Sequence, residues 1–525
     1  MKREQKKERK IIKNIIYIFI LIILLIDLFL FFGMNWVIKN VGVVSIDEVI
    51  FHLKVPLEGT SHTMINDFIL KCVVPTLLIF ITIVVLFQKR YKYESIFTIK
   101  VFKKEIKTNL KNIVKLICLI IGLLVLMIQL SDINKKFKVI EYIKLQRQNS
   151  KFIEENYVDP KSVKITFPDK KRNLIYIYLE SMETTYMDRE NGGNQDINLI
   201  PELTELAKKH ISFSDKETLG GAYQVSGASW TIAGMFSQTT GFPLKMPIDS
   251  NSYIGYKEFL PNVYTLGDIL EENGYNQMLM LGSDAKFAGR DSFFKTHGNY
   301  IIKDYYSAKK DKIIGKNHYE FWGMEDSYLF EYAKKELTEL SKKDEPFNLT
   351  MLTVNTHFPD GYVEKSCKEV IENNDYANSI SCSSKQVGDF VSWVKEQDFY
   401  ENTTIVLTGD HLSMANNIMF DNADRKIYNV FINPAIDSNH TNNKKFTSFD
   451  MFPTTLASIG ANVIGDRLGL GTNIYSEKKT LIEKYDIDYV NAELQKKSTF
   501  YNNNILYKNW FFFYILAINY YKWYN

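Results

Sequence analysis

The sequence predicts a membrane-anchored α/β protein with a mostly parallel central sheet. Three long apolar runs lie within the first 131 residues, and the rest alternates short β-rich apolar runs with amphipathic helical stretches. Such alternation is typical of βαβ units, whose strands pair in parallel. The 525-residue chain is long enough for several domains. We expect an anchor (1–131), a linker with some helix (132–172), a sheet domain (173–480) and an aromatic-rich tail (481–525).

The three apolar runs span 15–32, 68–87 and 113–130. Each is close to the roughly 20 residues that a helix needs to cross a bilayer. Asp27 lies inside the first run and Lys71 near the start of the second. We expect both side chains to snorkel or to pair within the helix bundle. The first run lacks the small-residue cleavage site of a signal peptide, so we expect a retained anchor.

The distribution of lysine and arginine predicts how these runs are oriented in the membrane. Basic residues crowd before the first run and between the second and third, whereas the loop between the first and second holds only Lys39 and Lys54. The positive-inside rule places the N-terminus and the second loop in the cytoplasm. We therefore expect a multi-pass protein of the cytoplasmic (inner) membrane, with everything after Leu130 on the periplasmic or extracellular side. The net charge of +3 and the absence of a basic patch argue against a nucleic-acid partner.

The cysteines agree with this orientation. Cys72 and Cys118 lie inside apolar runs, while Cys367 and Cys382 are the two cysteines of the outer part. An even pair in an oxidising compartment predicts a disulfide, and two unpaired thiols are the alternative.

The alternating region contains several recognisable elements. Strands are predicted at 173–179, 277–281, 349–356, 404–408 and 428–432, and helices at 326–340 and 386–396. Another helix is predicted from Ser448, with Gly460 closing it. The tail segment 507–524 is rich in tryptophan, tyrosine and phenylalanine. We expect it to form an interfacial helix, or alternatively to pack on the sheet domain.

Polar side chains follow three of the predicted strands. Run 173–179 leads into Glu180, run 349–356 into His357, and run 404–408 into Gly409-Asp410-His411. In open α/β sheets, ligands bind outside the carboxyl ends of the strands. The sequence thus predicts a metal site at that edge. Purely structural roles for these residues are the alternative, and they are expected for His297 and His318.

A segment rich in small residues, 219–235, follows the first of these strands. Small residues let backbone N–H groups approach a ligand, and the apolar stretch after Thr231 can start a helix whose N-terminus attracts phosphate. A hydroxyl placed there beside a divalent cation can act as a nucleophile. Ser226, Ser229 and Thr231 are the candidates, and spacing alone does not choose among them. A glycine-rich turn with capping hydroxyls is the alternative.

Ordered segments over most of residues 173–475 resemble the phosphoglycerol transferases that modify periplasmic glucans. Their relatives, the lipoteichoic acid synthases, share the wider alkaline phosphatase/sulfatase superfamily. The matching segments are Tyr176 to Ser181, Thr231 to Met235, Leu266 to Leu270, Phe287 to Asp291, His297-Gly298, Trp322-Gly323, Thr353 to Gly361, Cys382 and Asp410 to Leu412. The resemblance implies an extracytoplasmic domain of the alkaline phosphatase/sulfatase type.

The resemblance also implies a single divalent ion, manganese or alternatively magnesium, which suits oxygen-rich ligation with one imidazole. The implied metal ligands are Glu180, Thr231, Asp410 and His411. Thr231 is also the implied nucleophile. Arg290 and His357 are implied to bind the phosphate and glycerol of the donor, a task that suits the guanidinium fork. An ion pair between Arg290 and Asp291 is the structural alternative.

One departure concerns the product. In the lipoteichoic acid synthases a tryptophan stands two residues before the equivalent of Arg290, whereas this chain has Ala288 there, as in the glucan-modifying branch. The substitution argues against a lipoteichoic acid product.

The implied reaction moves phosphoglycerol from phosphatidylglycerol to a glycan or other polysaccharide through an intermediate on Thr231, and it releases diacylglycerol. A membrane anchor suits a lipid donor. A phosphoethanolamine transferase with the same threonine and metal is one alternative. A sulfatase is disfavoured because the chain has no Cys/Ser-x-Pro-x-Arg motif. A non-catalytic membrane protein that binds glycan or lipid is disfavoured because all four implied ligands are present.

Overall fold

A computed structural model describes residues 2–42, 44–55, 58–88, 96–101, 104–246, 258–414, 418, 423–438 and 441–506. The chain divides into two compact units. The first, here called the membrane unit, comprises Met1–Val43 and Ser61–Glu141, and the second, the sheet unit, comprises Val44–Thr60 and Tyr142–Asn525. The aromatic tail helix predicted at 507–524 lies outside the described residues.

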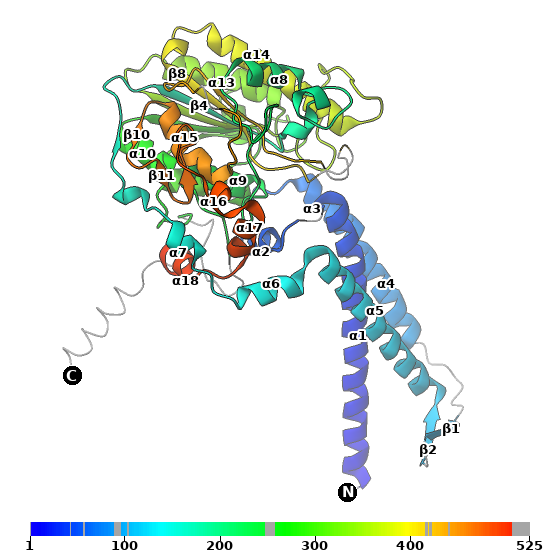
Figure 1. The fold of residues 1–525 in the computed structure, drawn as a ribbon. Coiled ribbons are helices and arrows are strands. Elements are labelled where there is room, and N and C mark those ends of the chain that lie inside the picture. The colour runs from blue at the N-terminus through cyan, green and yellow to red at the C-terminus, as the bar shows by residue number, and fades with distance from the viewer. Residues whose placement is uncertain are drawn as a thin grey trace, which may run out of the picture. The chain divides into compact units, whose positions relative to one another are not determined.

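The membrane unit contains three helical stretches long and apolar enough to cross a membrane: Asn14–Asn40, His62–Val85 and Ile113–Phe137. The first stretch belongs to α1 (Lys2–Asn40) and the third to α5 (Leu110–Phe137). The second runs through three consecutive elements, α3 (His62–Phe68), η1 (Ile69–Val73) and α4 (Val74–Gln88). The strands β1 (Ile96–Val101) and β2 (Lys104–Asn109) form an antiparallel hairpin before α5. The predicted N-terminal apolar helices are thus present (Figure 1).

The two ionisable residues of the apolar runs are accommodated within this unit. Lys71 forms an ion pair with Asp67 at 2.6 Å, and Asp67 also accepts a hydrogen bond from the indole of Trp36 at 2.9 Å. Asp27 is buried, and Gln129 of α5 donates to its backbone carbonyl at 3.0 Å. Asp27 and Asp67, the partner of Lys71, therefore each lie at a contact between two helices.

The sheet unit is built on a six-stranded sheet of order β6-β5-β7-β4-β8-β9. The strands are β4 (Asn173–Leu179), β5 (Asn276–Leu281), β6 (Ile301–Lys303), β7 (Phe347–Leu352), β8 (Thr403–Gly409) and β9 (Asn429–Ile432). All neighbours pair in parallel except β8 and β9. The predicted α/β class with a mostly parallel sheet is confirmed. The register pairs Leu179 with Gly409, so β4 and β8 end at the same level.

Helices cover both faces of this sheet, which explains why its strands read as continuous apolar runs. Along β4, Leu174, Tyr176 and Tyr178 belong to one buried cluster and the residues between them to the other. Helices α9 (Thr231–Thr240), α10 (Leu266–Glu272) and α15 (Met451–Ser458) pack in the first cluster. Helices α8 (Pro201–Lys209), α13 (Asp326–Leu340) and α14 (Asp375–Lys395) cover the opposite face (Figure 1).

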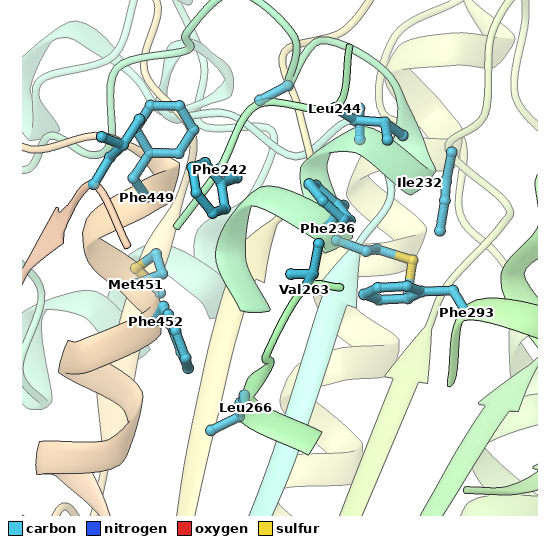
Figure 2. Packing of buried hydrophobic residues seen from close by; sticks show 14 of the residues in the cluster. Ile232, Phe236, Phe242, Leu244, Val263, Leu266, Phe293, Phe449, Met451 and Phe452 are labelled. Carbon is cyan, nitrogen blue, oxygen red and sulfur yellow. The ribbon is translucent and has the colours of Figure 1, made fainter. Parts of the chain in front are cut away.

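The core of the first face holds α9 in place. Ile232 and Phe236 project from α9 toward Phe293 of α11 (Arg290–Thr296), as Figure 2 shows. The rings of Phe236 and Phe293 lie 5.6 Å apart, and both side chains are almost fully buried. The predicted helix near Ser448 appears as η7 (Ser448–Asp450) followed by α15, and Gly460 follows with φ +85°.

The remaining elements complete the sheet unit. Two small antiparallel pairs join β3 (Ile165–Thr166) to β10 (Asn462–Val463) and β11 (Arg467–Leu468) to β12 (Gly471–Thr472). The other helices are α2 (Ile46–Lys54), α6 (Val139–Gln146, whose first three residues belong to the membrane unit), α7 (Phe152–Asn156), α12 (Tyr305–Lys310), α16 (Leu481–Tyr485), α17 (Ile487–Gln495) and α18 (Thr499–Tyr501).

Candidate metal and phosphate site

Glu180 is the first residue after β4, and its carboxylate is fixed from several directions. Its backbone N–H donates to Thr353 Oγ1 at 3.0 Å, and Thr356 Oγ1 donates to its carbonyl at 2.6 Å. Both threonines follow β7, the strand next to β4. Ser181 Oγ donates to Glu180 Oε1 at 2.9 Å. A side chain that is 2% exposed is thus held at the carboxyl edge of the sheet.

Asp410 and His411 follow β8 and are fully buried. Asp410 Oδ1 accepts hydrogen bonds from the backbone N–H groups of Ser181 and His411, each at 2.8 Å. His411 Nδ1 lies 2.8 Å from the carbonyl of Leu412, which can only accept, so Nδ1 carries the proton. In the neutral imidazole, Nε2 is therefore the ring nitrogen that carries the lone pair, and it faces the two carboxylates.

The residues at this edge fit a cation. One ligand atom from each of Glu180, Asp410 and His411 lies within 4.8 Å of the others. His411 Nε2 lies 3.3 Å from Glu180 Oε1 and 3.5 Å from Asp410 Oδ2. Yet neither His411 Nε2 nor Asp410 Oδ2 has a hydrogen-bond partner within the described part of the chain. Buried polar atoms are rarely left unpaired, and a divalent cation would satisfy both atoms. Two carboxylates with one imidazole suit Mn²⁺ or Mg²⁺.

The pKa values of Asp410 and His411 reflect how closely the three side chains lie together. Burial raises the pKa of Asp410 to about 8, and the negative charge of Glu180 adds to this rise. Burial alone would lower the pKa of His411, but the carboxylates of Asp410 and Glu180 outweigh it and raise that pKa to about 10. Without a cation the cluster thus compensates its negative charge by holding protons.

Thr231 is the first residue of α9, with Trp230 as the N-cap. Its Oγ1 donates to Glu180 Oε2 at 3.2 Å. A Cβ at Gly234 would come within 2.0 Å of the carbonyl oxygen of Asp410, so only glycine lets α9 approach the end of β8 this closely. The N-terminus of α9 thus directs unpaired N–H groups and its positive dipole end toward the carboxylate cluster.

The structure separates the three candidate hydroxyls of the glycine-rich segment. Thr231 Oγ1 contacts the cluster directly, whereas Ser229 Oγ lies 3.5 Å from Ser45 Oγ in the segment before α2. The backbone N–H of Ser226 donates to Asn491 Oδ1 in α17. Of the three, Thr231 is therefore the residue whose hydroxyl contacts the carboxylate cluster.

Arg290 begins α11 and is 5% exposed. Its Nε donates to the carbonyl of Phe287 at 3.1 Å, and its Nη2 donates to Ser283 Oγ and to the carbonyl of Asp284. Asp291 pairs with Lys295 instead, at 3.4 Å. Burial lowers the pKa of Arg290 to about 10, against the raising effect of Glu180, so the guanidinium stays charged at neutral pH. It forms no ion pair with a described carboxylate and is suited to an anionic ligand.

His357 lies in the loop after β7 and is half-buried. Its Nδ1 lies 2.8 Å from the carbonyl of Phe358, and its ring centroid lies 4.7 Å from that of Trp322. Burial lowers the pKa of His357, with Glu180 opposing the shift and His411 and Arg290 adding to it. His357 directly follows Thr356, whose hydroxyl donates to the carbonyl of Glu180, so the chain places His357 near the carboxylate cluster.

Cys367 and Cys382 are joined by a disulfide, with their Cα atoms 5.5 Å apart. The bond ties the loop after β7 to α14. Since this loop begins with the residues that fix Glu180 and carries His357, the disulfide restrains the segment that borders the site.

Several supporting residues were missed from the sequence. Thr353 and Thr356 fix the backbone of Glu180, and Asp326 accepts hydrogen bonds from the N–H groups of Val354 and Asn355 in the same loop. No local pattern marks such residues, because their partners are distant in sequence. His297 and His318 bind Asp268 and Glu325 respectively, in agreement with the structural roles expected for them.

Comparison with known proteins agrees with this architecture. The family described as Sulfatase matches residues 172–461. The chain therefore belongs to the sulfatase family, and the predicted kinship is confirmed. Among curated relatives, Phosphoglycerol transferase I of Escherichia coli O127:H6 (strain E2348/69 / EPEC) is 35% identical over 257 residues, covering 48% of this chain and 32% of the relative. The alignment thus spans about a third of that relative's length.

Two solved structures are also similar in fold. A protein in the alkaline phosphatase superfamily from Vibrio parahaemolyticus has a TM-score of 0.47 at 21% identity, covering 63% of this chain and 76% of that one. The lipoteichoic acid synthase LtaP from Listeria monocytogenes has a TM-score of 0.47 at 19% identity, covering 62% of this chain and 82% of that one.

Proposed function

We propose that this protein is a metal-dependent phosphoglycerol transferase of the cytoplasmic membrane. It takes phosphoglycerol from phosphatidylglycerol, holds it on Thr231 and passes it to a hydroxyl group of a glycan, such as a periplasmic glucan. The observation that carries the proposal is the Thr231 hydroxyl, which lies at a helix N-terminus 3.2 Å from Glu180 in a cluster with unpaired buried ligand atoms. The name of the 35%-identical relative supports the choice of phosphoglycerol.

The proposed metal ligands are Glu180, Thr231, Asp410 and His411. When bound, a divalent cation, which we propose to be Mn²⁺, supplies positive charge that favours the ionised threonine hydroxyl and screens the phosphate. The backbone N–H donors to Asp410 and the serine hydroxyl on Glu180 orient these carboxylates before substrate arrives.

The chemistry consists of two displacements at phosphorus. In the first, Thr231 Oγ1 forms a bond to phosphorus while the bond to the diacylglycerol oxygen breaks, and diacylglycerol leaves with the proton. In the second, the oxygen of an acceptor hydroxyl forms a bond to phosphorus while the bond between Thr231 Oγ1 and phosphorus breaks, and the proton of the acceptor passes to Thr231 Oγ1. Arg290 and His357 hold the phosphate oxygens in both steps, so that positioning and electrostatics lower the barrier.

The membrane unit supports a lipid donor. We propose that its three apolar helices span the membrane and that the sheet unit lies on the periplasmic or extracellular side. A lipid donor resides in the bilayer, so an enzyme that uses one has to be held at a membrane. Ala288, which precedes Arg290 by two residues, favours a glucan-type acceptor over lipoteichoic acid by resemblance alone.

Replacement of Thr231 by alanine tests the proposal. We expect the full-length Thr231→Ala protein in lipid vesicles to lose diacylglycerol release by at least about 10³-fold, because the attacking oxygen is gone. The assay measures diacylglycerol from headgroup-labelled phosphatidylglycerol with Mn²⁺, together with label retained on the protein. Ser226→Ala is the matched control, since it removes a hydroxyl of the same segment, and it should transfer normally. Substantial turnover by Thr231→Ala would refute the assignment. Release from phosphatidylethanolamine alone would reassign the donor.

A further inference from the structure

The segment between the first two apolar helices packs with the sheet unit. Residues Val44–Thr60, here called the α2 segment, belong to that unit although both flanking stretches belong to the membrane unit. Ser45 is the N-cap of helix α2, and its Oγ accepts a hydrogen bond from the backbone N–H of Glu48 at 3.2 Å. Phe51 is fully buried, and Ile50 and Val55 are nearly so, all within the core cluster that contains α9.

One end of the α2 segment contacts the residues just before the proposed nucleophile. The ring of Phe51 lies 5.5 Å from that of Trp230, the N-cap of α9. Ser45 Oγ lies 3.5 Å from Ser229 Oγ. The N-terminus of α9, and with it Thr231, is therefore bordered by α2.

The other end contacts the loop that carries Arg290. The ring of His52 stacks on Phe287 at 6.0 Å, and Phe287 provides the carbonyl that binds Arg290 Nε. Glu58 pairs with Lys286 at 2.9 Å. A Cβ at Gly59 would lie 2.4 Å from the backbone nitrogen of Phe287, so a glycine is required at this contact. The α2 segment thus connects the Thr231 side of the site to the Arg290 side.

Glu48 lies on the face of α2 that is turned toward the site. Residues three and four apart share one helix face, and Glu48 precedes Phe51 by three positions and His52 by four. Glu48 is 3% exposed. Its carboxylate has no hydrogen bond or ion pair with any residue that the structure describes. Its backbone N–H donates to Ser45 Oγ. Burial raises its pKa to about 8 and the positive charge of His411 lowers it, so a divalent cation at the site would further favour the ionised carboxylate.

We propose that Glu48 is a substrate-binding residue, and that its carboxylate accepts hydrogen bonds from hydroxyl groups of the polyol at the site. Phosphate oxygens offer no proton and would repel a carboxylate, so the phosphate lies toward Arg290 and the hydroxyl-bearing part toward Glu48. The hydroxyls belong either to the glycerol of the donor or to the sugar of the acceptor, which offer the same chemistry. This inference rests on the proposed function.

The test uses full-length protein and the variants Glu48→Gln and Glu48→Asp. Glu58→Gln is the matched control, because it makes the same change in the same segment at an exposed ion pair. In a binding arm, titration calorimetry with Mn²⁺ present compares glycerol phosphate with inorganic phosphate. In a turnover arm, the KM for phosphatidylglycerol and for a glucan acceptor is measured separately from kcat.

If Glu48 binds the donor glycerol, Glu48→Gln weakens glycerol phosphate about tenfold or more, as expected for a lost hydrogen bond to a charged group, and leaves inorganic phosphate within about twofold. If it binds the acceptor, the ratio of the two affinities is unchanged and the acceptor KM rises instead. Glu48→Asp, which keeps the charge, should fall between wild type and Glu48→Gln in the affected arm. A purely structural role would not separate the two ligands or the two KM values.

Two results would overturn the inference. One is a Glu48→Gln protein that matches Glu58→Gln in both arms. The other is a wild-type preference for phosphoethanolamine over glycerol phosphate that disappears in Glu48→Gln, since the carboxylate would then recognise an ammonium group. The binding arm needs no turnover. Absence of diacylglycerol release would therefore count against the proposed function, and titration of a soluble glucan in the binding arm would still decide between the two roles of Glu48.

Discussion

Asp410 and Asp450 are two buried aspartates of the same unit with opposite surroundings. Asp450 Oδ1 accepts from the N–H of Thr472 at 2.7 Å, and its Oδ2 accepts from the N–H and hydroxyl of Thr447 at 2.7 and 3.0 Å. Asp410 uses only Oδ1, while Oδ2 has no partner within the described residues and faces His411 Nε2. A carboxylate satisfied on both oxygens stabilises the fold, whereas one satisfied on a single oxygen has capacity left for a ligand.

Among the variants that test this comparison, Asp410→Asn is expected to have the largest effect. The asparagine oxygen can keep both backbone hydrogen bonds, so the fold should survive, but the site loses one negative charge and one ligand atom. We expect the metal affinity and the transfer rate to fall by more than about 100-fold, above the 10–100-fold typical for loss of an outer-shell partner. Metal binding is measured by calorimetry, and transfer by diacylglycerol release.

The thermal stability of the Asp410→Asn protein provides a second test of the comparison between the two aspartates. Because Asp410 Oδ2 has no partner among the described residues and asparagine keeps both hydrogen bonds of Oδ1, the metal-free Asp410→Asn protein should unfold at the same or a higher temperature than metal-free wild type. A large drop in the unfolding midpoint, with metal affinity preserved, would show that Asp410 serves the fold and not a ligand.

Asp450→Asn should behave in the opposite way. The amide nitrogen would face a donor N–H where an oxygen now accepts, which leaves a buried group unpaired and costs about 1–3 kcal/mol. We expect a lower midpoint of thermal unfolding with unchanged metal affinity and an unchanged transfer rate per folded molecule. A loss of metal affinity in this variant would erase the distinction between the two aspartates.

The sequence predicted the sheet where its strands are continuously apolar. Strand β4 was predicted with its observed bounds, and β8 extends the predicted run by one residue at each end. Strand β6 was missed because it has only three residues and Ile301 is half exposed. The strand order was not predictable either, since it depends on pairing between segments far apart in the chain.

Part of the site could be predicted because three of its residues directly follow such apolar strands. Glu180, Asp410 and His411 stand where predicted strands end, and the parallel register brings them together. Thr231 could not be chosen from spacing, because the choice depends on how closely α9 approaches β8 at Gly234. Glu48 was not foreseen at all. Its segment was interpreted only as a loop between two apolar runs, and nothing local indicates packing against residues near position 230.

For a change of a single pH unit, the pH dependence of metal binding is expected to be smaller than the effect of Asp410→Asn. In the metal-free protein, burial and the charge of Glu180 raise the pKa of Asp410, and the two carboxylates together raise the pKa of His411 against the effect of burial. Metal ligands must be deprotonated. At neutral pH the cluster must therefore release protons when the cation binds, and acid must weaken binding. Each proton released makes the apparent affinity rise about tenfold for each pH unit, as long as the pH lies below the pKa of the group that releases it.

The proton count is measured directly by calorimetry in buffers of different ionisation enthalpy. Asp450→Asn is the control, because it changes a buried aspartate that does not face the cluster, and it should release the same number of protons as wild type. Asp410→Asn should release fewer, since the group that holds a proton near neutral pH has been removed. Metal binding without proton release in wild-type protein would mean that the cluster is already fully deprotonated before the cation arrives. Asp410 and His411 would then be held in their deprotonated forms by their surroundings before any cation binds.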